Sequence, residues 1–185
     1  MYIIEHLEPR IWKWCLIEYK HISKIVCKKN LWFTNVKNGS DELKKYGKVI
    51  TSSVRHLKLK NACILDPDAK KTLTPKEAEE FDYFIFGGIL GDWPPKKRTK
   101  QLLSSYLNCE KRNIGKKQMS TDTAVFVVKS IKEGTSLQRI NFKQGIEITT
   151  GKNESVRMPY QYALIDGKQL ISEELVNYLK RKRGF

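Results

Sequence analysis

The stretch FDYFIFGGILGDWPPKKRTKQLL, residues 81–103, decides the fold that we predict for this chain. Its apolar first part, Phe81 to Phe86, has the length and bulk of a strand that is buried on both faces. The glycine-rich residues 87–92 follow, and glycine lets a ligand approach the main chain closely. Pro94 and Pro95 suit the first positions of a helix, which we expect to end near Leu107. The stretch therefore predicts a strand, a glycine loop and a helix that form one edge of a binding site.

Basic residues at the start of this helix favour a ligand over a simple turn. Lys96, Lys97 and Arg98 occupy its first turn, where the helix dipole disfavours cations by roughly 0.3 to 1 kcal/mol each. A tight turn alone would explain the glycines, but it would not explain these bases. We therefore expect an anionic group nearby.

The composition predicts a folded, basic protein. A length of 185 residues suits one domain, 1–185, and 40% hydrophobic with 30% charged residues suits a packed core. The formal charge of +15 favours a negatively charged partner such as RNA or a ribonucleoprotein surface. A solvated lysine face would give the same charge balance, so basicity alone does not decide the partner.

The cysteine and histidine spacing predicts neither disulfides nor a metal site. Four cysteines lie far apart in the sequence, and the three histidines fall in no zinc-ligand pattern. The chain begins without a signal segment and has no apolar run of membrane-spanning length. We expect a soluble, cytoplasmic protein with reduced thiols and no membrane partner.

Strand and helix patterns alternate along the chain. Strands are expected at 2–4, 31–36, 62–65, 81–86, 146–150 and 158–165, and helices at 11–26, from 74, from 94, at 124–131 and after 172, while 49–59 stays unassigned. Alternation of this kind predicts an α/β sheet with helices on both faces. Ligands bind such sheets at the carboxyl ends of the strands, here the loops at 66–67, 87–92 and 115–121.

Five motifs together resemble a small family of SPOUT-class methyltransferases. They are YIIEH at 2–6, LDP at 65–67, FDYFIFGGILGDWPPKKRTKQL at 81–102, KKQMSTDTA at 116–124 and MPYQY at 158–162. The likeness spans nearly the whole chain, although this chain is shorter between its first helix and LDP. The family was first described as RNA methyltransferases, and its fungal member is a protein arginine methyltransferase that acts on a small-subunit ribosomal protein. The resemblance thus implies methylation of a ribosomal protein arginine.

The resemblance also implies a fold and a cofactor. The fold is a SPOUT-type knotted α/β sheet with a C-terminal trefoil knot, formed where residues 115–123 thread past residues 87–92. The cofactor is S-adenosylmethionine, held chiefly by backbone groups of the knotted loops. The implied cofactor-binding residues are Asp66, Pro67, Gly87, Gly88, Ile89, Leu90, Gly91, Asp92, Arg98, Gln118, Met119, Ser120, Thr121 and Thr123.

An arginine acceptor would need a carboxylate to hold it. A guanidinium stays protonated at neutral pH, and paired carboxylate oxygens grip it in a planar fork. The candidate catalytic residues are Asp92, Glu5 and Asp122, with Glu8 as a further candidate, and a cap or surface charge is the alternative for each. Asp92 is favoured because it ends the glycine loop, so Asp92→Asn should abolish turnover and leave the fold intact.

Two alternatives stay open from the sequence. The charge favours an RNA methyltransferase of the same fold acting on tRNA or rRNA, whereas the resemblance favours an arginine acceptor. A non-enzymatic RNA-binding protein on the same fold is the second alternative. We expect a monomer, because the sequence identifies no apolar patch of the size that a dimer interface needs.

Overall fold

The computed structural model describes residues 1–88, 98–151 and 154–181. Its larger sheet has the strand order β3-β2-β1-β5-β4-β6, and every paired strand in it is parallel. The two central strands are β1 and β5, and β5 pairs with β1 on one side and β4 on the other. The strands are β1 (Tyr2–His6), β2 (Leu31–Thr34), β3 (Lys48–Val49), β4 (Ala62–Leu65), β5 (Tyr83–Gly88) and β6 (Glu110–Arg112).

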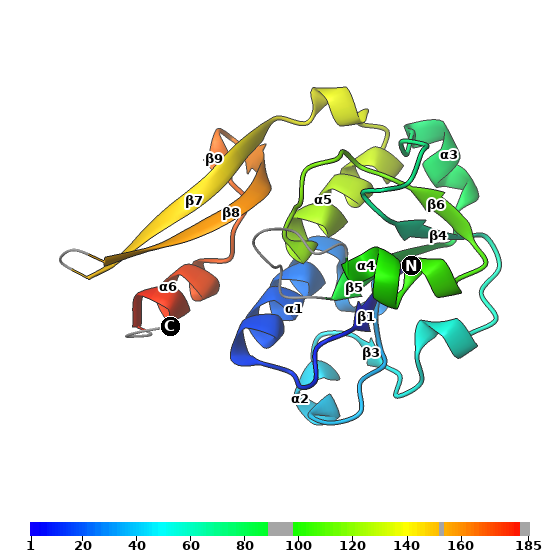
Figure 1. Cartoon of the computed structure of the whole chain (residues 1–185), viewed down its shortest axis with the longest axis horizontal. Helices are drawn as coiled ribbons and strands as arrows, with labels where there is room; N and C mark the ends of the chain where they lie inside the picture. Colours follow the sequence, from blue (N-terminus) through cyan, green and yellow to red (C-terminus); the bar gives the residue numbers. More distant parts are fainter. Residues whose placement is uncertain (89–97, 152–153, 182–185) are drawn as a thin grey trace.

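Three helices cover one face of this sheet (Figure 1). They are α1 (Lys13–Val26), α3 (Pro75–Glu80) and α5 (Thr121–Lys132). Cys15, Tyr19 and Ile22 of α1 are buried there with Ile4 and Phe84 of the sheet. The apolar stripe predicted for residues 11–26 thus becomes the main core contact of the first helix.

Shorter segments cover the opposite face. Val54 of the 3₁₀ turn η2 (Val54–His56) and Leu103 are buried there with Ile3, Ile64 and Ile85. Leu103 lies between α4 (Arg98–Leu102) and the 3₁₀ turn η3 (Ser104–Tyr106). The expected helices on both faces are therefore long on one face and short on the other.

A second, antiparallel sheet contains the C-terminal strands β7 (Phe142–Gly151), β8 (Glu154–Ile165) and β9 (Lys168–Gln169). The β7–β8 hairpin extends away from the larger sheet, and α6 (Glu173–Arg181) lies beside it (Figure 1). Ile17 of α1 packs into the cluster formed by Met158, Tyr162, Leu175 and Leu179. Helix α1 is therefore buried on two sides, between the large sheet and the hairpin.

Most elements expected from the sequence are present. The helix expected from residue 74 is α3, and Thr74 caps it in a capping box with Glu77. The remaining short elements are α2 (Ser40–Leu43), η1 (Lys28–Asn30) and η4 (Leu137–Arg139). Strand β6 was missed because its residues are all charged, and β9 because it has only two residues. The trefoil knot stays a prediction.

Candidate functional site

A cavity of about 640 Å³ opens at the carboxyl ends of β4, β5 and β6. Its wall also includes residues of α1, the start of α5, β8 and α6, so both sheets contribute to it. It brings together most of the described residues that the sequence placed in a site. Those lining it are Asp66, Pro67, Gly87, Arg98, Gln118, Met119, Ser120, Thr121 and Asp122.

Three predicted residues lie beside the cavity rather than in its wall. Gly88 and Thr123 are buried in the core beneath it. The carboxylate of Glu5 accepts hydrogen bonds from Thr34 Oγ1, Ser53 Oγ and the N–H of Val54. Alternation along β1 directs Glu5 toward the face covered by η2, away from the helices. Its carboxylate therefore anchors the chain around Ser53, outside the cavity wall.

Four other predicted residues, Ile89, Leu90, Gly91 and Asp92, lie outside the described residues. The expected roles of Asp92 therefore stay predictions. The bases Lys96 and Lys97 also lie outside the described part of the chain.

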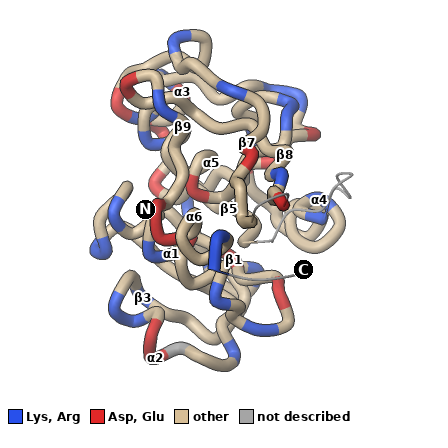
Figure 2. The backbone as a smooth tube through the Cα atoms, turned by 90° about the vertical axis from the view of Figure 1, so that its left-hand side faces the viewer, with Lys and Arg blue, Asp and Glu red and all other residues tan. Residues whose placement is uncertain are grey.

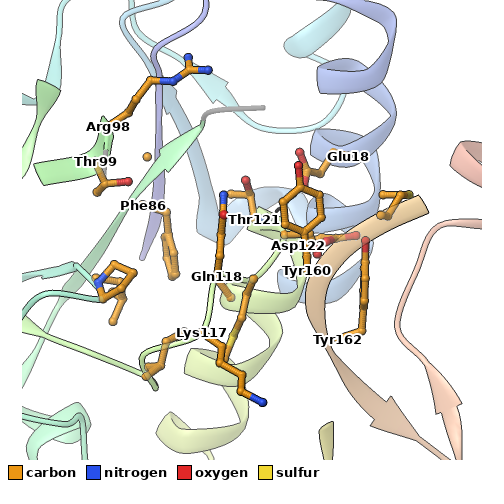
Figure 3. A pocket seen from close by; sticks show the side chains of 18 of the residues that line it. Glu18, Phe86, Arg98, Thr99, Lys117, Gln118, Thr121, Asp122, Tyr160 and Tyr162 are labelled. Carbon is orange, nitrogen blue, oxygen red and sulfur yellow. Dashed lines mark hydrogen bonds between the residues drawn. The ribbon is translucent and has the colours of Figure 1, made fainter. Parts of the chain in front are cut away.

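Arg98 forms an ion pair within the protein. Its Nη1 lies 3.3 Å from Oε1 of Glu8. Arg98 lines the cavity, but its guanidinium points away from Tyr160 and Tyr162 (Figure 3). Glu8, the further carboxylate candidate, therefore neutralises a cavity base. The expected role of Arg98 in binding the cofactor stays a prediction.

The loop before α5 is fixed at both of its ends. Gly115 N–H bonds Asn113 Oδ1, and Lys116 Nζ donates to the carbonyl oxygens of Pro67 and Ala69. At the other end the carbonyl of Gln118 accepts a hydrogen bond from the N–H of Gln161 on β8, over 2.8 Å. The cavity wall is thus tied both to the loop after β4 and to the C-terminal hairpin.

Glu18 is the most informative residue that the sequence reasoning missed. It lies on α1 and lines the cavity, and its Oε1 accepts the Thr121 N–H over 2.9 Å. Ser120 is the N-cap of α5, but its hydroxyl donates to Thr123 Oγ1 instead of capping the helix. Glu18 therefore supplies the capping oxygen from another helix. The sequence feature that could have identified Glu18 is its position: it is an acidic residue on the apolar stripe of the helix, between Cys15 and Ile22.

Burial and a neighbouring charge perturb Glu18. Removal from water and, to a lesser extent, the nearby Asp122 carboxylate together raise the pKa of Glu18 to about 8. Burial also raises the pKa of the Tyr162 phenol, with Asp122 and Glu18 adding to the effect. Figure 3 shows the Tyr160 and Tyr162 hydroxyls on the side of these two carboxylates. The cavity floor is therefore a pair of buried acids with a tyrosine beside each.

Asp122 has a second partner behind it. Nδ1 of His21 lies 2.7 Å from Oδ2 of Asp122, and the Thr123 N–H donates to Oδ1 over 2.8 Å. Asp122 is 2% exposed. Both of its oxygens are therefore fixed in place.

Two buried polar atoms in the cavity wall lack a partner within the described residues. They are Oε1 of Gln118 and the hydroxyl of Tyr162. Buried polar atoms are nearly always hydrogen-bonded, so orphans of this kind point to a polar ligand in the cavity.

The described residues contain no cluster of three or more His, Cys, Asp or Glu side chains that could hold a metal ion. Within those same residues, no helix is both long and apolar enough to cross a membrane.

Comparisons with known proteins identify the relatives of this chain. The family model described as protein arginine N-methyltransferase SFM1-like matches residues 1–184. Protein arginine N-methyltransferase SFM1 of Saccharomyces cerevisiae is 36% identical over 200 residues, which cover 97% of this chain and 94% of the yeast protein. The crystal structure of yeast SFM1 complexed with SAM has a TM-score of 0.87 and 35% identity, covering 97% of this chain and 89% of that one.

A more distant likeness bears on the fold alone. Dual-specific Trm10 from Thermococcus kodakaraensis has a TM-score of 0.53 at 17% identity, over 74% of this chain and 95% of that one. With the yeast structures, it confirms the SPOUT-type α/β fold predicted from the sequence. The match over nearly every residue shows that this chain belongs to the SFM1-like family of protein arginine N-methyltransferases.

Proposed function

We propose that this protein transfers a methyl group from S-adenosylmethionine to an arginine of a small-subunit ribosomal protein. The observation that carries the proposal is the pair of buried acids, Glu18 and Asp122, on the floor of the cavity formed by the predicted cofactor loops. Family membership and the yeast SAM complex support both the reaction and the cofactor. The ribosomal acceptor is the part that rests on the sequence resemblance.

The cavity fits the cofactor in size and in chemistry. A volume of about 640 Å³ falls in the range of pockets that enclose drug-sized ligands. The loop at 114–120 and residues Asp66, Pro67 and Gly87 would hold the cofactor, with Gln118 Oε1 offering an acceptor that no described residue uses. S-adenosylmethionine supplies an electrophilic methyl group on a sulfonium when it is bound.

The two carboxylates hold the acceptor arginine and accept its proton. A guanidinium enters with one positive charge and no freely available lone pair, so the protein must orient one nitrogen and take one proton from it. Asp122 anchors the guanidinium, because its oxygens are fixed by His21 and Thr123. Glu18 takes the proton, because a base whose pKa lies near the working pH transfers protons most efficiently. The methylated product then leaves with a single positive charge.

The charge distribution supports a ribosomal particle as the setting of the acceptor. Residues 43–65 contain six Lys or Arg and no Asp or Glu, and all six bases are exposed. Figure 2 shows further basic positions spread over the loops and helix ends. A surface of this charge repels a free basic peptide and suits a protein segment that lies among RNA phosphates. The same observation favours RNA methylation as a second candidate function.

The test incubates the protein and labelled S-adenosylmethionine with ribosomal fractions, followed by protease or ribonuclease. Label that is lost to protease and kept after ribonuclease, and that is recovered as methylarginine, is the expected result. Label that survives protease but is lost to ribonuclease would overturn the arginine proposal in favour of RNA. The Glu18→Gln variant serves as the matched control, since it keeps an oxygen for the Thr121 N–H. Calorimetry that detects no S-adenosylmethionine binding at millimolar ligand would leave a non-enzymatic RNA-binding protein.

A further inference from the structure

His21 connects the cavity floor to a second hollow on the far side of α1. It follows Glu18 by one helical turn, and its Nδ1 contacts Asp122 Oδ2 across 2.7 Å. Its side chain is 16% exposed and lines a groove of about 790 Å³ between α1 and α6. The imidazole therefore touches a buried carboxylate on one side and open solvent on the other.

The two carboxylates of the floor have unequal partners. The Thr121 N–H donates to Glu18, and the Thr123 N–H donates to Asp122. The hydroxyl of Thr121 and the N–H of Asp122 also interact with Glu18. Asp122 instead has the imidazole of His21, which is the only ionisable side chain among these donors. Two acids that share a buried site do not both ionise readily, and the one with the better donors keeps the charge.

We propose that His21 is a positioning residue for methyl transfer: it holds the Asp122 carboxylate in the orientation that grips the acceptor guanidinium, which leaves Glu18 to accept the proton of the acceptor arginine. The inference rests on the proposed function, because it assigns separate roles to the two acids of that site. This role explains why His21 contacts Asp122 from outside the cavity wall. It also agrees with the pKa of Glu18, which burial and Asp122 raise to about 8.

The charged groups around His21 come from three helices. Asp122 faces it from α5, and Lys24 of its own helix shares the groove with it. The groups lining the same groove from α1 and α6 also include Lys13, Glu173, Glu174, Tyr178 and Arg181. Acids and bases are thus mixed on the solvent side, so the direct hydrogen bond to Asp122 is the specific interaction that singles out this carboxylate.

Three substitutions separate positioning from other roles. In His21→Asn the amide nitrogen takes the place of Nδ1, so the donor to Asp122 is kept without a titrating ring. In His21→Gln the amide reaches the place of Nε2 instead, and in His21→Phe the donor is lost with the ring shape kept. We expect His21→Asn to retain kcat within about threefold, whereas Gln and Phe lower it about 10- to 100-fold, below the full effect of removing a general base.

The pH–rate profile is the readout that a packing role would not move. Loss of the donor disfavours the ionised form of the acid pair, so the acidic limb should move to higher pH in His21→Phe and His21→Gln but stay in place in His21→Asn. Calorimetry with S-adenosylmethionine and thermal unfolding check that each variant folds and binds cofactor. If His21→Phe does not fold, the kcat values and pH profiles of His21→Asn and His21→Gln still test whether a donor at the place of Nδ1 is required.

The outcomes are distinct. Equal kcat values and pH profiles in all variants overturn the inference. A His21→Asn variant that is as impaired as His21→Gln also overturns it, because a hydrogen-bond donor at the place of Nδ1 would then not be sufficient for catalysis. A wild-type protein that binds cofactor but methylates no protein arginine overturns the proposed function instead.

Discussion

The carboxylate of Glu18 on α1 accepts a hydrogen bond from the backbone N–H of Thr121 at the start of α5, over an N···O distance of 2.9 Å. The pair joins residues 103 positions apart in the sequence. It fixes the first turn of α5 to α1 and at the same time places an acid in the cavity. One carboxylate therefore serves as a helix cap and as a candidate base.

Glu18→Gln should separate these two roles. The amide oxygen can still accept from Thr121, so the fold and cofactor binding should persist, while the loss of a base should lower kcat about 10²- to 10⁴-fold. Methyl transfer under saturating cofactor is the measurement. Glu18→Ala is the companion variant, and it should also lower stability by about 0.5–2 kcal/mol through loss of the cap. A Gln variant with wild-type kcat would rule Glu18 out as the base.

The rate should rise with pH toward about 8. Burial and Asp122 raise the pKa of Glu18 to about 8, so at lower pH most of this acid is protonated and unable to accept a proton. We expect kcat/KM to increase through pH 6 to 8 and then level off, measured with buffers of constant ionic strength. A rate that is flat across this interval would contradict the assignment of Glu18.

The same shift has a consequence for stability. The pKa of Glu18 is higher in the folded protein than its ordinary value of 4.5, so the folded state binds more protons between these two values. The stability that this protonation provides is fully present below pH 4.5 and is lost as the pH rises through about 8. We therefore expect the Tm of Glu18→Gln to exceed that of the wild type by a larger margin at pH 8 than at pH 5. Equal differences in Tm at both values would contradict this.

Gly88→Ala should destabilise the protein. A Cβ at this position would lie 2.8 Å from Cγ2 of Ile4 and closer still to the hydroxyl of Tyr19, and both residues are fully buried. Overpacking of this kind costs about 1–3 kcal/mol. Gly151→Ala is the control, because its nearest contact would be 3.4 Å away on the exposed hairpin. Urea unfolding of the two variants checks the difference, and similar losses in both would show that the core yields around Gly88.

Gln118→Leu should weaken cofactor binding without lowering stability. The Oε1 atom of Gln118 is buried without a described partner, so the folded protein loses no hydrogen bond to it when the amide is replaced by an apolar group of similar shape. An acceptor lost to the ligand corresponds to about a tenfold increase in Kd for S-adenosylmethionine. Calorimetry measures it, with the exposed Gln138→Leu as control. Unchanged affinity would place the cofactor away from Gln118.

Local pattern was sufficient for much of the fold. Period-3.6 apolar spacing identified α1, the aromatic run at 81–86 identified β5, and the helix expected from residue 74 is α3. The three residues of β6 escaped notice because pairing at a sheet edge needs no apolar side chains. The loops at the strand ends were predicted as a site because parallel strands bring their carboxyl ends together.

The sequence by itself determined the alternation of strands and helices, the strand-end loops that form the cavity, and Asp122 as a candidate carboxylate. Only the tertiary structure decided which acids share the site, because burial and contact are properties of packing between distant segments. It directed Glu5 into a network under η2 and brought Glu18, one acid on an apolar helix face, to the start of α5. It also placed His21 behind Asp122, 101 positions away, where no spacing rule reaches.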